Sequence, residues 1–167
     1  YSKSDMLPAL NNIESFQVTT AGDFFGAFDS GIYKTNYETS ICILPLVAAN
    51  DLPTYETTIT NAKDYLLSIQ NTEANVYSCD PDTPLNCEFY GGWGYGDPSY
   101  PWADLSNTQW TLMGLHYAYN ALGLTSADTD FGTDALTYVR HCHNDTYIND
   151  LSLPGFPGTD GGLTYNP

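Results

Sequence analysis

Helical segments of two kinds alternate along this chain, and the alternation is what most constrains the fold. Residues 54–70 place apolar side chains at spacings of three and four, which predicts a helix with one buried face. Residues 110–122 are apolar on most sides, which predicts a helix buried nearly all round. Residues 39–50 are of the second kind, whereas residues 4–16 and 133–143 are of the first kind. The sequence therefore predicts an all-α fold with buried helices inside and amphipathic helices outside.

Local signals predict where these helices begin, bend and end. Pro53 has the place that proline takes in a first helical turn, and Gly123 has the place of a left-handed cap after the last turn. Ser106 and Gln109 match a capping box, which predicts Ser106 as the cap of the helix that follows. Pro45 is expected to bend its helix, because proline removes one backbone hydrogen bond. No segment shows the alternation of a strand.

An outer helix, a glycine turn and an inner helix recur as a unit. Three copies can be aligned: Tyr65 and Gln70 with Gly91-Gly92-Trp93, His143 with Gly161-Gly162-Leu163, and, less closely, Gln17 with Gly26-Ala27-Phe28. A glutamine near a helix end can donate to free carbonyls, and glycines permit a sharp turn. Trp93 can cover the start of the next helix. These residues are therefore expected to build the fold rather than to carry an activity.

The run Tyr65-Leu66-x-x-x-Gln70 followed by Gly91-Gly92-Trp93 resembles the QW motif of the squalene-cyclase and prenyltransferase repeat family. Residues 104–109 are similar to the start of an inner helix in secreted and prokaryotic members. The resemblance spans about two and a half repeats, with His143 and Leu163 in the places of the motif's glutamine and tryptophan. It implies that residues 1–167 form one segment of an (α/α) toroid of about a dozen helices. Such a segment would belong to a longer parent chain or assemble with copies of itself.

This sequence lacks the catalytic residues that the activities suggested by the resemblance require. A terpene cyclase uses an Asp-x-Asp-Asp acid, which is absent, and Asp128-Thr129-Asp130 instead reads as a charge cluster before a helix. A prenyltransferase zinc site needs Asp, Cys and His, but His141 and His143 lie about 200° apart on a helix and cannot both face one metal. The thioester run Cys-Gly-Glu-Gln is also absent. The catalytic residues are therefore unassigned, and no metal site is predicted.

The connection over residues 71–103 is 33 residues long, and residues 72–103 form an aromatic-rich insertion. Aromatic rings beside carboxylates suit glycans or apolar small molecules. The insertion and the following helix supply the residues that we expect at the rim of a cavity: Trp93, Tyr95, Asp97, Trp102, Asp104 and His116. The alternative is a loop whose aromatic side chains bury one another, and a His116 that is hydrogen-bonded inside the core.

The cysteines leave two interpretations open. Cys79 and Cys87 lie in one polar loop, and a disulfide between them would close a short ring. Cys42 and Cys142 lie in helical patterns and are expected as small buried side chains. Asn144 begins one glycosylation-type sequon. The cysteine loop, acidity and few lysines together favour an extracellular protein. No cofactor is predicted, and calcium is the weaker alternative, because the loop aspartates match no calcium-loop spacing.

Charge excludes several classes of partner. The chain has 4 Lys and Arg against 20 Asp and Glu, a net charge of −16. It therefore lacks the cations that nucleic acids or anionic membranes require. No apolar run is long enough for a transmembrane helix. Three hypotheses follow: a non-catalytic extracellular domain that binds or assembles with itself or its parent chain, a fragment of a terpene-cyclase-type enzyme, and a polysaccharide-binding or polysaccharide-active protein.

Overall fold

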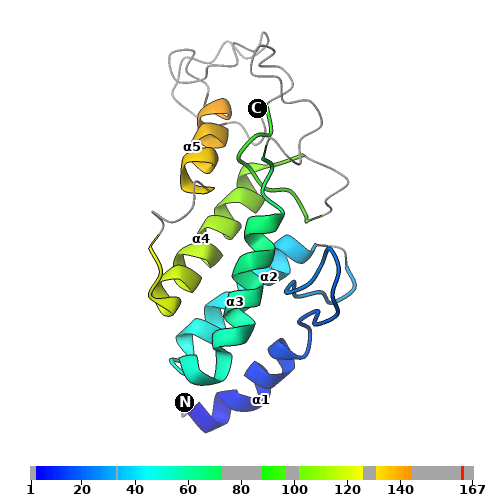
Figure 1. Cartoon of the computed structure of the whole chain (residues 1–167), viewed down its shortest axis with the longest axis vertical. Coiled ribbons are helices and arrows are strands. Elements are labelled where there is room, and N and C mark those ends of the chain that lie inside the picture. The colour runs from blue at the N-terminus through cyan, green and yellow to red at the C-terminus, as the bar shows by residue number, and fades with distance from the viewer. Residues whose placement is uncertain are drawn as a thin grey trace.

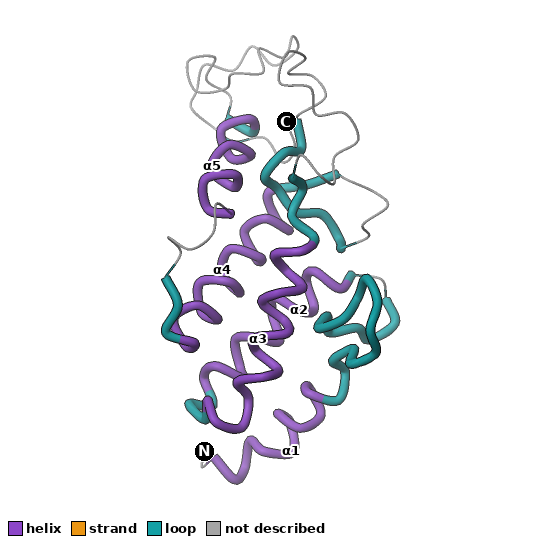
Figure 2. The backbone as a smooth tube through the Cα atoms, in the orientation of Figure 1, coloured by secondary structure: helices purple, strands orange, loops and turns teal. Residues whose placement is uncertain are grey.

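The computed structural model describes residues 3–32, 34–72, 88–96, 102–125, 131–143 and 163. This part of the chain contains five helices: α1 (Lys3–Glu14), α2 (Thr35–Ala48), α3 (Leu52–Ser68), α4 (Leu105–Leu122) and α5 (Phe131–His141). Between them, the described residues form loops and two isolated antiparallel bridges, with no strand (Figure 2). The all-α prediction is therefore confirmed.

The helices α2, α3 and α4 form the centre of the molecule (Figure 1). The most extensive contact joins α2 to α4, and α3 packs against both of them. The helix α1 lies at one end of this group and α5 at the other. The two segments predicted as inner helices are thus paired, with an outer helix across them.

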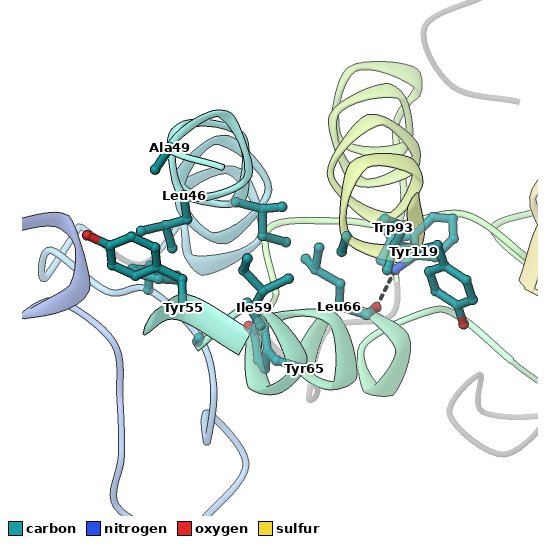
Figure 3. Packing of buried hydrophobic residues seen from close by; sticks show 14 of the residues in the cluster. Leu46, Ala49, Tyr55, Ile59, Tyr65, Leu66, Trp93 and Tyr119 are labelled. Carbon is teal, nitrogen blue, oxygen red and sulfur yellow. Dashed lines mark hydrogen bonds between the residues drawn. The ribbon is translucent and has the colours of Figure 1, made fainter. Parts of the chain in front are cut away.

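One hydrophobic core lies between these three helices, and its packing is drawn in Figure 3. It is built from side chains that recur at spacings of three and four on α3 and from the facing sides of α2 and α4. Its members that are at most 2% exposed on these helices are Ile43, Leu46, Tyr55, Ile59, Ala62, Tyr65, Leu66, Leu115 and Ala118. The predicted amphipathic pattern of α3 is therefore confirmed.

The helix ends agree with the sequence signals at some points and differ at others. Pro53 lies in the first turn of α3, and Gly123 caps α4 with φ 66°. The predicted cap at Ser106 is wrong, because α4 begins at Leu105 and the side chain of Asp104 accepts a hydrogen bond from Asn107 N at 2.7 Å. An aspartate is as good a cap as a serine, and this one lies two residues earlier.

The inner helices are less buried than the sequence predicts. Ile41 on α2 is 43% exposed and Tyr117 on α4 is 45% exposed, although both helices are apolar on most sides. Each helix buries one side against its neighbours, and nothing in the described part of the chain covers the other side. The helices α2 and α4 therefore each have an open face. On α5, Leu136 is 50% exposed, whereas Ala135 and Tyr138 are buried.

Candidate functional site

The side chain of Gln70 joins two segments that are far apart in the sequence. Its Nε2 donates to the carbonyl of Gly91 at 2.9 Å and to the carbonyl of Phe131 at 3.0 Å. Gln70 is only 3% exposed, so both hydrogen bonds are protected from water. Both of these acceptors lie outside α3, so Gln70 ties the glycine turn to the start of the next helix, α5.

Gln17 makes the same two contacts one repeat earlier. Its Nε2 donates to the carbonyl of Gly26 at 3.1 Å and to the carbonyl of Thr58, in the next outer helix α3, at 2.8 Å. The backbone pairing beside it also repeats, since Val18 N donates to Ala27 O as Asn71 N donates to Gly92 O. The first and second repeats are thus each joined to the next outer helix by an equivalent glutamine.

The glycine turns approach the next outer helix closely. Gly26 has φ +88° and Gly91 has φ +85°, a region that favours glycine. A Cβ on Gly26 would overlap the backbone carbonyl of Asn61 in α3, and a Cβ on Gly91 would overlap that of Asp134 in α5. Both glycines are therefore required by backbone conformation and by contact between repeats.

Trp93 is fully buried and closes the end of α3. Its Nε1 donates to the carbonyl of Leu66 at 2.7 Å, one of the last carbonyls of that helix (Figure 3). Its backbone N donates to Thr108 Oγ1 at 3.1 Å, just as Phe28 N donates to Thr39 Oγ1 at 2.8 Å in the first repeat. Phe28 and Trp93 therefore hold the same place, and Thr39 is the equivalent of Thr108.

The third copy follows the same register where the structure describes it. His143 forms an antiparallel bridge with Leu163, as Gln17 does with Phe28. The predicted Gly161 and Gly162 lie outside the described residues. The internal repeat found in the sequence is thus a repeat of hydrogen bonds in the fold.

The residues predicted at the rim of a cavity separate into different environments. Trp93 and Asp104 are both fully buried, so their predicted place at a rim is wrong. Asp104 caps α4, and its two carboxylate oxygens accept from the backbone N and the side-chain Nδ2 of Asn107, each at 2.7 Å. A buried carboxylate is stabilised there by these donors and by the positive end of the helix dipole. Asp97 lies outside the described residues.

Tyr95 and Trp102 do come together, beside the first turns of α2 and α4. Their rings meet edge to face with centroids 5.0 Å apart, and the ring of Tyr37 lies 6.0 Å from that of Tyr95. The Nζ of Lys34 lies 5.1 Å from the centre of the Tyr95 ring. We call Tyr37, Tyr95 and Trp102 the aromatic cluster. Its half-buried rings, one cation and nearby hydroxyls can contact the faces of a sugar or an apolar ligand.

His116 lies apart from the aromatic cluster. It is exposed on α4, about 17 Å along the helix axis from Leu105. One ring nitrogen lies 3.0 Å from Asn120 Nδ2, and the ring contacts Tyr117. The interpretation of His116 as a core histidine is therefore wrong, because position 116 falls on the exposed side of α4. Its place at the rim of a cavity stays a prediction.

A buried polar network between α2 and α4 was not predicted. Asn36 Nδ2 donates to Gly94 O at 2.7 Å, and Asn36 Oδ1 accepts from Thr111 Oγ1 at 2.7 Å and from Ser40 Oγ at 3.2 Å. Asn107 Oδ1 lies 3.3 Å from Asn36 Nδ2. Small polar residues four apart in two otherwise apolar helices were the available signal. The network fixes how the two inner helices pack, since buried polar groups need partners.

The described cysteines are free thiols. Cys142 is fully buried, as predicted, and Cys42 is partly buried. Burial raises the pKa of both thiols to about 11, with Glu38 contributing at Cys42. Among the described residues, no three His, Cys, Asp or Glu side chains are close enough to hold a metal ion. The predicted Cys79–Cys87 disulfide and the Asn144 sequon lie outside the described residues.

Comparison with protein-family models, with curated proteins and with solved structures gave no match. No helix in the described ranges is both long enough and apolar enough to cross a membrane. The case for a function therefore depends on the repeat contacts, the open helix faces and the aromatic cluster.

Proposed function

We propose that this chain is a structural module that assembles with further copies of its own repeat, from a second molecule or from the remainder of a longer parent chain. One observation carries the proposal: the first repeat makes these contacts with the second, and the second makes them with the third. The glutamine, the glycine turn and the inner helix of one unit all contact helices of the following unit.

The open faces support this proposal. Ile41 on α2 and Tyr117 on α4 are about as exposed as many surface residues, at 43% and 45%, although they belong to the most apolar helices of the chain. Large exposed apolar surfaces mark interaction sites in soluble proteins. In the family that the repeat resembles, such faces belong to an (α/α) toroid, and a segment of a toroid would leave them open at its two ends.

Self-association should strengthen with salt. The net charge of −16 makes two copies repel each other, and salt screens this repulsion. We expect sedimentation velocity to show monomers at about 0.01 M salt, where the Debye length is about 30 Å, and oligomers at about 1 M, where it is about 3 Å. A chain that stays monomeric at both salt concentrations would contradict self-assembly.

A glycan-binding role is a second candidate, favoured by the aromatic cluster. Edge-to-face rings with a nearby cation and hydroxyls present the mixture of apolar and polar contacts that sugars use. We expect Trp102→Ala to weaken binding to a glycan array at least about tenfold, which is about 1.4 kcal/mol. The fold should stay intact, as measured by circular dichroism. Unchanged binding in this variant, or no glycan bound by the unmodified chain, would remove this candidate.

A further inference from the structure

A groove of about 360 Å³ lies along α2 on the side turned away from α4. Positions 36 and 40 of α2 face α4, and position 42 lies about 200° from position 40 around the helix. The volume is within the range of small-molecule sites, about 300–1,000 Å³. The apolar part of the lining comes from the end of α1, the loop that follows it and α2: Phe16, Phe28, Ile32, Tyr37, Ile41 and Cys42.

Two carboxylates also line this groove, and backbone and hydroxyl donors hold both of them in place. The backbone N of Ser30 donates to Glu38 Oε2 at 2.9 Å, and the hydroxyl of Ser30 donates to Glu38 Oε1. The backbone N of Gly31 donates to Asp29 Oδ1 at 2.7 Å. Burial and the charge of Glu38 together raise the pKa of the Cys42 thiol, so the field of this carboxylate reaches into the groove.

The one cation of the described lining does not neutralise both carboxylates. The Nζ of Lys34 lies 5.1 Å from the centre of the Tyr95 ring, in the aromatic cluster. In the described part of the chain, Lys34 forms no ion pair with Asp29 or Glu38. The lining therefore has an excess of one negative charge, and the net charge of −16 adds to the attraction for cations.

We propose that this groove binds an apolar molecule that carries one quaternary ammonium group. Aromatic rings and negative charge are what recognise such a cation, and the groove combines them in Phe16, Tyr37 and the two carboxylates. Both oxygens of Glu38 already accept hydrogen bonds, so this residue offers charge more than free acceptors, and a quaternary ammonium has no N–H to donate. The apolar part of the ligand packs on Ile41, which is 43% exposed.

Titration calorimetry with octyltrimethylammonium tests the charge preference. The proposal needs only the single chain, so we choose about 0.01 M salt, where the chain is expected to be monomeric. Octyl sulfate has the same apolar chain and the opposite charge, and it should bind at least about tenfold more weakly. Glu38→Gln should weaken binding of octyltrimethylammonium at least about fivefold. Glu56→Gln, on the exposed side of α3 and outside the lining, is the matched control and should change the affinity less than about twofold.

Two further measurements locate the ligand. Ile41→Ala should weaken binding at least about threefold through lost apolar contact, whereas Leu136→Ala, at an exposed position of α5, should leave the affinity within about twofold. Saturating octyltrimethylammonium should slow alkylation of Cys42 by N-ethylmaleimide, measured by peptide mass spectrometry, at least about tenfold. Circular dichroism checks that each variant keeps its helices.

Each contrary outcome rejects a defined part of the proposal. No binding of octyltrimethylammonium by the unmodified chain would overturn the site. Equal binding of octyl sulfate, or equal losses in Glu38→Gln and Glu56→Gln, would overturn its preference for a cation. Unchanged alkylation of Cys42 at saturation would place the ligand outside the groove. The sedimentation experiment tests the assembly separately, so either proposal can fail while the other stands.

Discussion

Gly91→Ala is expected to lower the free energy of unfolding by about 3 kcal/mol or more and to detach α5. A left-handed backbone costs a residue with a Cβ about 1–2 kcal/mol, and overpacking costs a further 1–3 kcal/mol. At Gly91 both penalties apply, because φ is +85° and the new Cβ would overlap the carbonyl of Asp134. That carbonyl belongs to the backbone of α5 and cannot rotate away, so the helix must move.

Gly31→Ala is the matched control. Gly31 has φ +87°, almost the same as Gly91, but nothing lies within 4 Å of a Cβ at this position. We expect Gly31→Ala to lower the free energy of unfolding only by the cost of the left-handed backbone, about 1–2 kcal/mol. Urea denaturation followed by circular dichroism measures both variants, and their difference isolates the contact with α5. Equal losses would mean that the turn does not press against α5. Gly26→Ala should behave like Gly91→Ala, since its Cβ would overlap Asn61 of α3.

The sequence predicts the helices well because the signals for them are local. The spacing of apolar residues in α3, a proline in its first turn and Gly123 after α4 act over a few residues. The repeat could also be found, because turns that require glycine place glycines at equivalent positions of each copy. The start of α4 was misplaced because Ser106 and Asp104 are both good caps, and packing decides between them.

The exposure of each helix face was not predictable in the same way. A helix that is apolar on most sides indicates burial, but whether its second side is covered depends on segments outside the helix. Ile41 is exposed for this reason, although Ile43, two residues further along α2, is fully buried. The polar network around Asn36 was also missed, because its partners come from α4 and from the loop before it.

The burial of two tryptophans in one loop of the candidate site could not be predicted from the sequence either. Trp93 and Trp102 are nine positions apart and equally aromatic, and both were predicted at a cavity rim. One is fully buried against the end of α3, whereas the other stays half-buried beside Tyr95. Only the repeat alignment separated them, since it gave Trp93 a second, structural role.

Trp93→Ala is expected to cost about 3–5 kcal/mol of the free energy of unfolding, enough to unfold much of a domain of ordinary stability. The substitution removes the fully buried side chain with the largest volume in the described core and leaves a cavity between α3 and α4. It also leaves the carbonyl of Leu66 without its indole donor. Trp102→Ala is the matched control, and we expect a loss of about 1 kcal/mol, because this ring is only half-buried.

Trp93→Phe separates packing from hydrogen bonding at the same position. Phe28 occupies the equivalent place in the first repeat, where it is 1% exposed, so a phenyl ring fits this environment. The variant keeps most of the apolar contact and loses the Nε1 hydrogen bond to Leu66 O, for an expected cost of about 1–3 kcal/mol. Chemical denaturation should therefore rank the variants as Trp102→Ala, Trp93→Phe and Trp93→Ala in order of increasing loss. If Trp93→Ala lost no more stability than Trp102→Ala, Trp93 would not be the residue that closes the repeat, and a ligand-binding role for it would have to be considered again.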